Sequence, residues 1–189
     1  MAKAKLKAVE TPVELKLDLG CGPNKKEGFT GVDRRKFDGV DVVLDLTGPW
    51  PWKDGTVSEV YMCHSMEHFT GKERVKIVNE MHRVMRVGAK ATIITPYWCS
   101  NRAYGDFTHQ WPPVSEMWFY YLSREWRLAN APDNDSKWNK DGYSCDFECT
   151  WGYSPHPHFV PKNQETQSFA MQFYKDAVTD ITCTWVKRG

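Results

Sequence analysis

The apolar residues of the first half of the chain fall into short runs separated by glycines, acids and prolines. Runs of this length are typical of buried parallel strands, and they predict strands at the following ranges: 15–19, 30–33, 41–46, 59–63 and 91–95. Between the last two, Val75, Val78 and Met85 recur at helical spacing. Residues 72–87 therefore predict an amphipathic helix that Gly88 ends.

The connection after the first strand is too short for an ordinary crossover helix. About seven residues separate Gly22 from Thr30, and Gly28 lies among them. A crossover helix normally needs ten or more residues, so the first helix is expected to be short or absent. Strands and helices otherwise alternate, which predicts an open α/β sheet with ligands at the carboxyl ends of its strands.

The second half is dense in tryptophan and tyrosine and is interrupted by prolines. Its patterns predict a helix at 115–128 with Ser115 as N-cap, a polar loop at 133–142, a strand at 146–153, a helix at 164–177 and a strand at 180–186. The predicted fold class is α/β: a Rossmann-like open sheet, mostly parallel with an antiparallel C-terminal strand, and helices on both faces. Residues 1–13 are expected to form a flexible tail.

Composition narrows the classes of partner and compartment. The 189 residues carry a net charge of +1, which gives no bulk attraction to nucleic acid or membranes. No apolar run reaches the roughly 20 residues of a membrane span, and no signal peptide is recognisable. We therefore expect a cytoplasmic protein whose six cysteines are reduced thiols.

Two interpretations remain open for a group of cysteines and histidines. Cys145, Cys149, His156 and His158 offer the donor atoms of a tetrahedral zinc site, although their spacing is not that of a standard zinc motif. Alternatively, both thiols are small core residues on one face of a strand. No other residue is assigned as a metal ligand.

The turn after the first strand carries the clearest chemical signal. Gly20 and Gly22 allow a ligand to approach the backbone closely, and Cys21 lies between them. A dinucleotide fingerprint would place a third glycine where this chain has Lys25. The missing glycine, and the acid Asp18 just before the turn, favour S-adenosylmethionine over NAD. An ordinary strand-to-helix turn is the alternative.

Further acids follow the next strands. Asp33 is suited to accept hydrogen bonds from both ribose hydroxyls of a nucleoside, and Asp45 with Leu46 is suited to the adenine ring. A turn carboxylate and a loop cap are the respective alternatives. Cys63 and His64 end the fourth strand at the same sheet edge, which adds them to the expected cofactor site.

With these pieces in place, the chain resembles class I S-adenosylmethionine-dependent methyltransferases. It is most similar to small predicted members whose first motif reads Leu-Gly-Cys-Gly-Pro-Asn, as in residues 19–24. The resemblance extends from about residue 15 to 122 and includes the motifs at 63–69 and 104–109. It implies one methyltransferase domain over 14–189, with the substrate side formed from about residue 97, and contacts from the two glycines to the methionine part of the cofactor.

The resemblance implies methyl transfer as the activity. In this reaction the protein mainly has to align the nucleophile, the methyl group and the sulfur. His109 is the first candidate for a general base, with Asp106 to orient it and His64 as its rival. The aromatic second half favours a small molecule or saccharide as acceptor, and a nucleic acid or modified nucleotide is the alternative. A nicotinamide oxidoreductase and a non-catalytic S-adenosylmethionine-binding module are the competing classes. The oligomeric state is left open.

Overall fold

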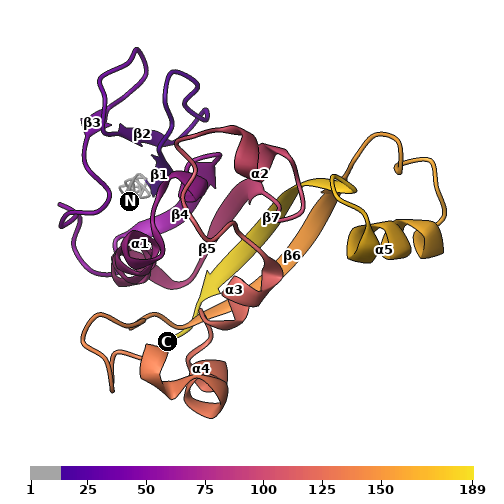
Figure 1. Cartoon of the computed structure of the whole chain (residues 1–189). Coiled ribbons are helices and arrows are strands. Elements are labelled where there is room, and N and C mark those ends of the chain that lie inside the picture. The colour runs from indigo at the N-terminus through magenta and orange to yellow at the C-terminus, as the bar shows by residue number, and fades with distance from the viewer. Residues whose placement is uncertain (1–13) are drawn as a thin grey trace, which may run out of the picture.

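One seven-stranded sheet organises the chain (Figure 1). The computed structural model describes residues 14–189, and the predicted tail at 1–13 lies outside the described residues. The strands are β1 (Leu15–Leu19), β2 (Thr30–Asp33), β3 (Val42–Val43), β4 (Val57–Cys63), β5 (Met85–Pro96), β6 (Phe147–Pro155) and β7 (Val178–Lys187). Their spatial order is β3-β2-β1-β4-β5-β7-β6. The first five strands pair in parallel, and β7 is antiparallel to both neighbours. The predicted fold class is confirmed.

The helices are short apart from the one that connects β4 to β5. They are α1 (Gly71–Val84), α2 (Arg102–Gly105), α3 (Glu116–Tyr120), α4 (Arg124–Asn130) and α5 (Gln164–Phe173), with 3₁₀ turns η1 (Met66–His68) and η2 (Pro132–Asn134). The helix α5 projects away from the sheet, beyond the ends of β6 and β7 (Figure 1). Within residues 14–189, no helix is long and apolar enough to cross a membrane.

The core lies on the sheet face that α1 and α3 cover. Strand pairing aligns Leu17 with Val60, Val60 with Ala91, and Ala91 with Trp185, all fully buried. Buried residues of α1 belong to the same cluster, and Phe119 of α3 packs at 6.4 Å from the Trp185 ring. These contacts tie the aromatic second half to the parallel first half.

The opposite face is more polar, and the connection after β1 covers part of it. As predicted, residues 20–29 form no helix. The Phe29 ring packs edge-on against Tyr61 at 6.2 Å, and Lys26 Nζ lies 4.3 Å from the Tyr61 ring centroid. A loop therefore replaces the first helix, and it stays close to the sheet through these contacts.

The predicted end of the central helix at Gly88 is wrong. The helix α1 ends at Val84, and Met85 is already extended, fully buried and paired with Val57. Gly88 has φ of +78° and lies inside β5, where the pairing with β4 shifts register. Burial of Met85 in the sheet thus ends the helix before the glycine is reached.

The predicted helix at 115–128 is two helices. Ser115 occupies the N-cap position of α3 without a side-chain hydrogen bond, whereas Ser123 accepts a bond from Trp126 N and begins α4. Between them, the Leu122 carbonyl accepts from Phe147 N at 2.9 Å. This link to the start of β6 takes a carbonyl that a continuous helix would use. The predicted helix at 164–177 likewise ends early, at Phe173.

Candidate functional site

The glycine turn lies between the ends of β2 and β4. Gly20 N donates to Val32 O at 2.7 Å, and both Gly20 and Gly22 have positive φ, +69° and +53°. A Cβ on Gly20 would stand 2.1 Å from Ser65 Oγ, whereas one on Gly22 would have nothing within 4 Å. The turn is therefore packed tightly against the end of β4 at Gly20 and open at Gly22.

This packing gives a testable stability difference. We expect Gly20→Ala to lower the free energy of unfolding by roughly 2–4 kcal/mol, because positive φ and a steric clash act together. Gly28→Ala is the matched control, since Gly28 has φ of +77° but a Cβ there would meet nothing within 4 Å. Chemical denaturation measures both, and equal losses in the two variants would contradict the packing of Gly20 against Ser65.

Asp33 joins the glycine turn to β2. Its Oδ2 accepts from Gly22 N and its Oδ1 from Arg35 N, both at 2.9 Å. A carboxylate has about four acceptor positions, so two remain for ligand hydroxyls. The geometry is that of a turn carboxylate which keeps acceptor capacity, and both interpretations of the sequence are compatible with it.

Asp18 and Cys21 are held by the protein itself. Asp18 is only 3% exposed, and its Oδ2 accepts from Lys26 N at 2.7 Å. Burial raises the pKa of Asp18 and also raises the pKa of the Cys21 thiol, to about 11. Cys21 is therefore a protonated thiol near neutral pH, and Asp18 ties down the loop that replaces the first helix.

Asp45 and Leu46 follow β3, next to the end of β2. Leu44 N donates to Asp33 O at 2.9 Å, which brings this segment beside the Asp33 backbone. Asp45 Oδ1 accepts from Thr47 N at 2.9 Å and from Thr47 Oγ1 at 2.8 Å. Asp45 thus caps its own loop, while its side chain stays exposed and Leu46 is buried.

His64 stands at the end of β4 in a strained conformation. Its φ is +49°, unusual for a residue with a side chain, and its N–H donates to Ile94 O at 2.9 Å. Its Nδ1 lies 3.3 Å from Glu67 Oε1, and this hydrogen bond raises the pKa of His64. Burial raises the pKa of the neighbouring Cys63 thiol. Strain of this kind clusters at functional sites.

A cavity of about 570 Å³ opens beside His64. Its walls come from η1, the end of β5 and the segment around α2: His64, Glu67, His68, Pro96, Arg102, Gly105, Asp106, Phe107 and His109. All three residues predicted from the sequence to be catalytic therefore line one cavity. Glu67, His68 and Arg102 were not singled out, although the adjacent acid and imidazole at 67–68 were visible in the motif.

Within the cavity, Asp106 does not hydrogen-bond to His109. Its Oδ2 is 3.9 Å from His109 Nε2, and its Oδ1 instead accepts from Thr108 Oγ1 at 2.7 Å. The group bonded to the His109 ring is the Ala103 carbonyl, 3.4 Å from Nδ1. The backbone of α2 thus orients the His109 imidazole. The sequence had predicted Asp106 for this role.

The zinc site considered from the sequence is not formed. Cys149 and His156 are seven positions apart, with six residues of the extended strand β6 between them, which is a span of about 23 Å. Cys145 is fully buried, with its Sγ 3.8 Å from Leu122 O. The interpretation of these thiols as core residues is the one the structure supports.

Comparison with solved structures identifies the fold. A methyltransferase from Archaeoglobus fulgidus, described as S-adenosylmethionine-dependent, superposes with a TM-score of 0.63 at 17% identity, over 93% of this chain and 87% of its own. The fold is that of class I methyltransferases. The YcgJ protein of Bacillus subtilis matches at 0.52 and 14% identity, over 95% of this chain and 94% of its own.

A geranyl diphosphate methyltransferase, solved in complex with GPP and sinefungin, matches the fold of this chain with a TM-score of 0.50. The identity is 15%, over 95% of this chain and 72% of that one. No family model and no curated protein matches the sequence. The resemblance noted from the motifs is therefore supported by the three-dimensional fold.

Proposed function

We propose that this chain is an S-adenosylmethionine-dependent methyltransferase whose acceptor binds in the cavity beside His64. The observation that carries the proposal is the meeting of two features at the end of β4. Ser65 lies against the glycine turn, and the adjacent His64 lines the cavity. A cofactor over the turn and an acceptor in the cavity would then be neighbours, as direct transfer of a group requires.

The residues present fit this cofactor. The open space at Gly22 admits a ligand close to the backbone, and Asp33 retains acceptor capacity for ribose hydroxyls. Asp45 and Leu46 are proposed to contact adenine. Asp18, Cys21 and Cys63 are proposed to complete the cofactor site at the ends of β1 and β4. When bound, S-adenosylmethionine supplies a methyl group on a positively charged sulfur. The protein's part is to bind, orient and exclude water.

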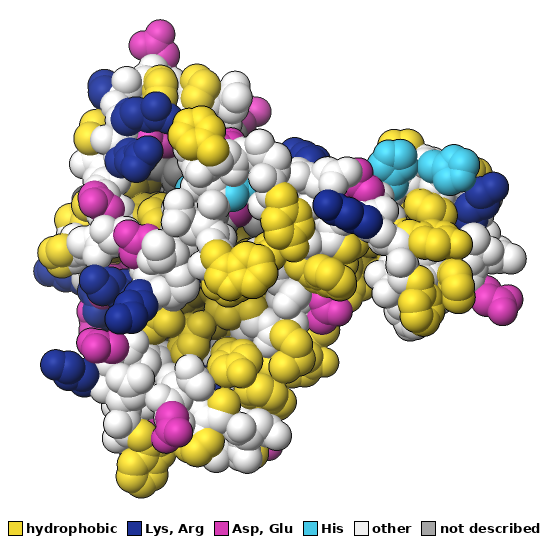
Figure 2. Space-filling model, in the orientation of Figure 1, with side chains coloured by type: hydrophobic (Ala, Val, Ile, Leu, Met, Phe, Trp, Pro, Cys, Tyr) yellow, Lys and Arg dark blue, Asp and Glu magenta, His cyan; other side chains and the backbone are white. Residues whose placement is uncertain are grey.

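A small molecule or saccharide is the proposed acceptor. Phe107 lines the cavity and is almost completely exposed. Trp98, Tyr104 and Trp111 are further exposed aromatic side chains of the same stretch of the chain. Figure 2 shows hydrophobic side chains gathered on this face around α2 and α3. Rings of this kind stack on sugars and small apolar groups. The cavity volume of about 570 Å³ suits a small molecule or a sugar. One protein of similar fold is named as a geranyl diphosphate methyltransferase.

The acceptor side is proposed to comprise His109, His64 and Asp106. Because Ala103 O accepts a hydrogen bond from His109 Nδ1–H, the lone pair of the neutral imidazole lies on His109 Nε2. That nitrogen is suited to accept a proton from an acceptor hydroxyl or amine.

Transfer of a labelled methyl group tests the activity. The protein is incubated with methyl-labelled S-adenosylmethionine and separate pools of small metabolites, oligosaccharides, RNA and DNA. We expect label in the first or second pool. Label in a nucleic-acid pool would contradict a small-molecule or saccharide acceptor and assign a nucleic acid instead. Binding of the cofactor without label in any pool would favour the non-catalytic module.

A further inference from the structure

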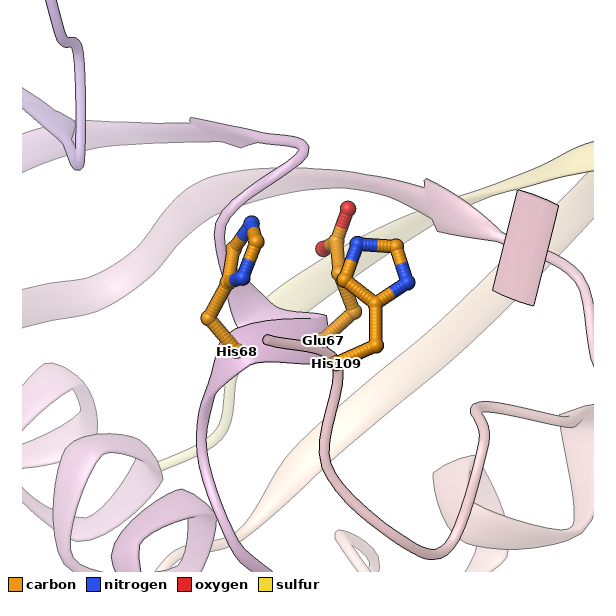
Figure 3. A group of neighbouring side chains, drawn as sticks. All are labelled: Glu67, His68 and His109. Atoms are coloured by element: carbon orange, nitrogen blue, oxygen red, sulfur yellow. The ribbon is translucent and has the colours of Figure 1, made fainter. Parts of the chain in front are cut away.

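Three metal-ligating side chains converge on the wall of the cavity. Glu67 and His68 come from η1, and His109 comes from the segment after α2. One donor atom from each lies within 4.8 Å of the others. Figure 3 shows the Glu67 carboxylate beside the two imidazole rings, all three pointing to the same side of the ribbon. The two ring centroids are 4.8 Å apart.

Both histidines are already oriented through Nδ1. His109 Nδ1 faces the Ala103 carbonyl at 3.4 Å and can only donate to it. Thr108 Oγ1 donates its proton to Asp106 Oδ1, so it accepts from His68 Nδ1 at 2.9 Å. Each ring therefore carries its lone pair on Nε2. In a metal-ligating histidine, the other ring nitrogen usually donates to a carbonyl or a carboxylate. Ala103 O is that partner for His109, and Thr108 Oγ1, which is bonded to Asp106, is the partner for His68.

The Glu67 carboxylate is buried in a way that favours a cation. It is 5% exposed, and its oxygens contact His64 Nδ1 at 3.3 Å and Thr95 Oγ1 at 3.2 Å. The nearby guanidinium of Arg74 donates to backbone carbonyls instead, among them Met66 O and Pro112 O. A buried carboxylate costs free energy unless its charge is compensated. His64 supplies part of that compensation, and an ion bound to Glu67 would add to it.

We propose that Glu67, His68 and His109 bind a divalent transition-metal ion of the Zn²⁺, Co²⁺ or Mn²⁺ class. Two imidazoles with one carboxylate suit such ions, whereas Mg²⁺ and Ca²⁺ prefer oxygen ligands alone. Ligands on one tetrahedral ion lie about 3.4 Å apart, so the side chains need to approach by about 1.4 Å. Three protein ligands leave a position open to the cavity, which takes water or an oxygen of a hydroxyl-bearing ligand.

Binding of the ion does not depend on the proposed function. The role of the ion toward the acceptor does rest on that function. An oxygen on the open position would lie in the same cavity as the acceptor. With the ion bound, His109 holds it through Nε2 in place of acting as a base. The ion then narrows the preferred acceptors to molecules that carry a hydroxyl or carboxylate group.

Cobalt binding to the full chain tests the site. Protein stripped with a chelator is titrated with Co²⁺ and followed by visible absorption, and Zn²⁺ is then added as competitor. We expect one ion per chain, displaced by Zn²⁺. Glu67→Gln, His68→Gln and His109→Gln keep the size of each side chain and should each weaken binding by about 100-fold or more, beyond the loss typical of an outer-shell partner.

His158→Ala is the matched control, because His158 is exposed on the connection to α5 and far along the chain from the cluster. It should bind Co²⁺ as the unaltered chain does. Thr108→Val should weaken binding about 10- to 100-fold through its contact to His68, with Thr108→Ser restoring it. Circular dichroism checks that each variant is folded.

No cobalt spectrum, or binding kept by any of the folded Gln variants, would overturn the proposed site. The titration contains no adenosyl ligand. Failure of the metal site with S-adenosylhomocysteine binding intact is therefore distinguishable from failure of the proposed function, which would remove adenosyl binding and leave the cobalt titration unchanged.

Discussion

Replacing Arg127 with alanine is expected to lower the free energy of unfolding by about 3–5 kcal/mol, because it leaves a buried carboxylate without its partner. Arg127 and Asp135 are almost completely buried, and their Nη2 and Oδ2 atoms are 2.9 Å apart. Arg127 also donates to Tyr121 O and Cys145 O, both at 2.7 Å. One side chain thus joins α3, η2 and the approach to β6.

Urea denaturation measures the loss. Arg124→Ala on the same helix is the control, because Arg124 is exposed and contacts Asp146 only through its backbone N–H. The control should change stability by less than about 0.5 kcal/mol. Small and equal changes in both variants would show that the segment between α3 and β6 is held by its aromatic packing instead.

Replacing Asp33 with alanine is expected to weaken S-adenosylhomocysteine binding about 100-fold or more. Hydrogen bonds to a charged group contribute about 1.5–3 kcal/mol each, and two ribose hydroxyls would lose theirs. Isothermal titration calorimetry measures the affinity. The variant also loses the bond from Gly22 N, so a melting curve accompanies each titration.

Asp38→Ala is the control for Asp33, since Asp38 is exposed on the loop that follows. Its affinity should equal that of the unaltered chain. An Asp33→Ala variant that is folded and binds with unchanged affinity would assign Asp33 to the turn alone and remove it from the cofactor site.

Much of the sheet could be predicted because its strands have recognisable local sequence patterns. An apolar run followed by glycine marks β1, and one followed by proline marks β5. The shortness of residues 23–29 correctly predicts that a first helix is short or absent. The errors lie where distant contacts outweigh local spacing. Met85 leaves its helix to pair with Val57, and Leu122 gives its carbonyl to Phe147. Neither partner is visible from the neighbouring sequence.

The site could be predicted in position more than in detail. The rule that ligands bind at carboxyl ends of parallel strands placed Asp33, Asp45 and His64 at one edge. It could not show that Ala103 O rather than Asp106 orients His109, because a backbone carbonyl has no signature in the sequence. Nor could it show that His68 and His109, 41 residues apart, meet beside Glu67.

The glycine turn of this chain is proposed to hold an S-adenosyl ligand. A thermal-melting series with S-adenosylhomocysteine, S-adenosylmethionine and NAD tests it most directly. Ligand at 100 times its Kd adds about 2.7 kcal/mol, and for a chain of this size that raises Tm by roughly 5–10 °C. We expect such a rise with both adenosyl ligands and none with NAD. No rise with either adenosyl ligand at millimolar concentration, or a rise with NAD alone, would contradict it.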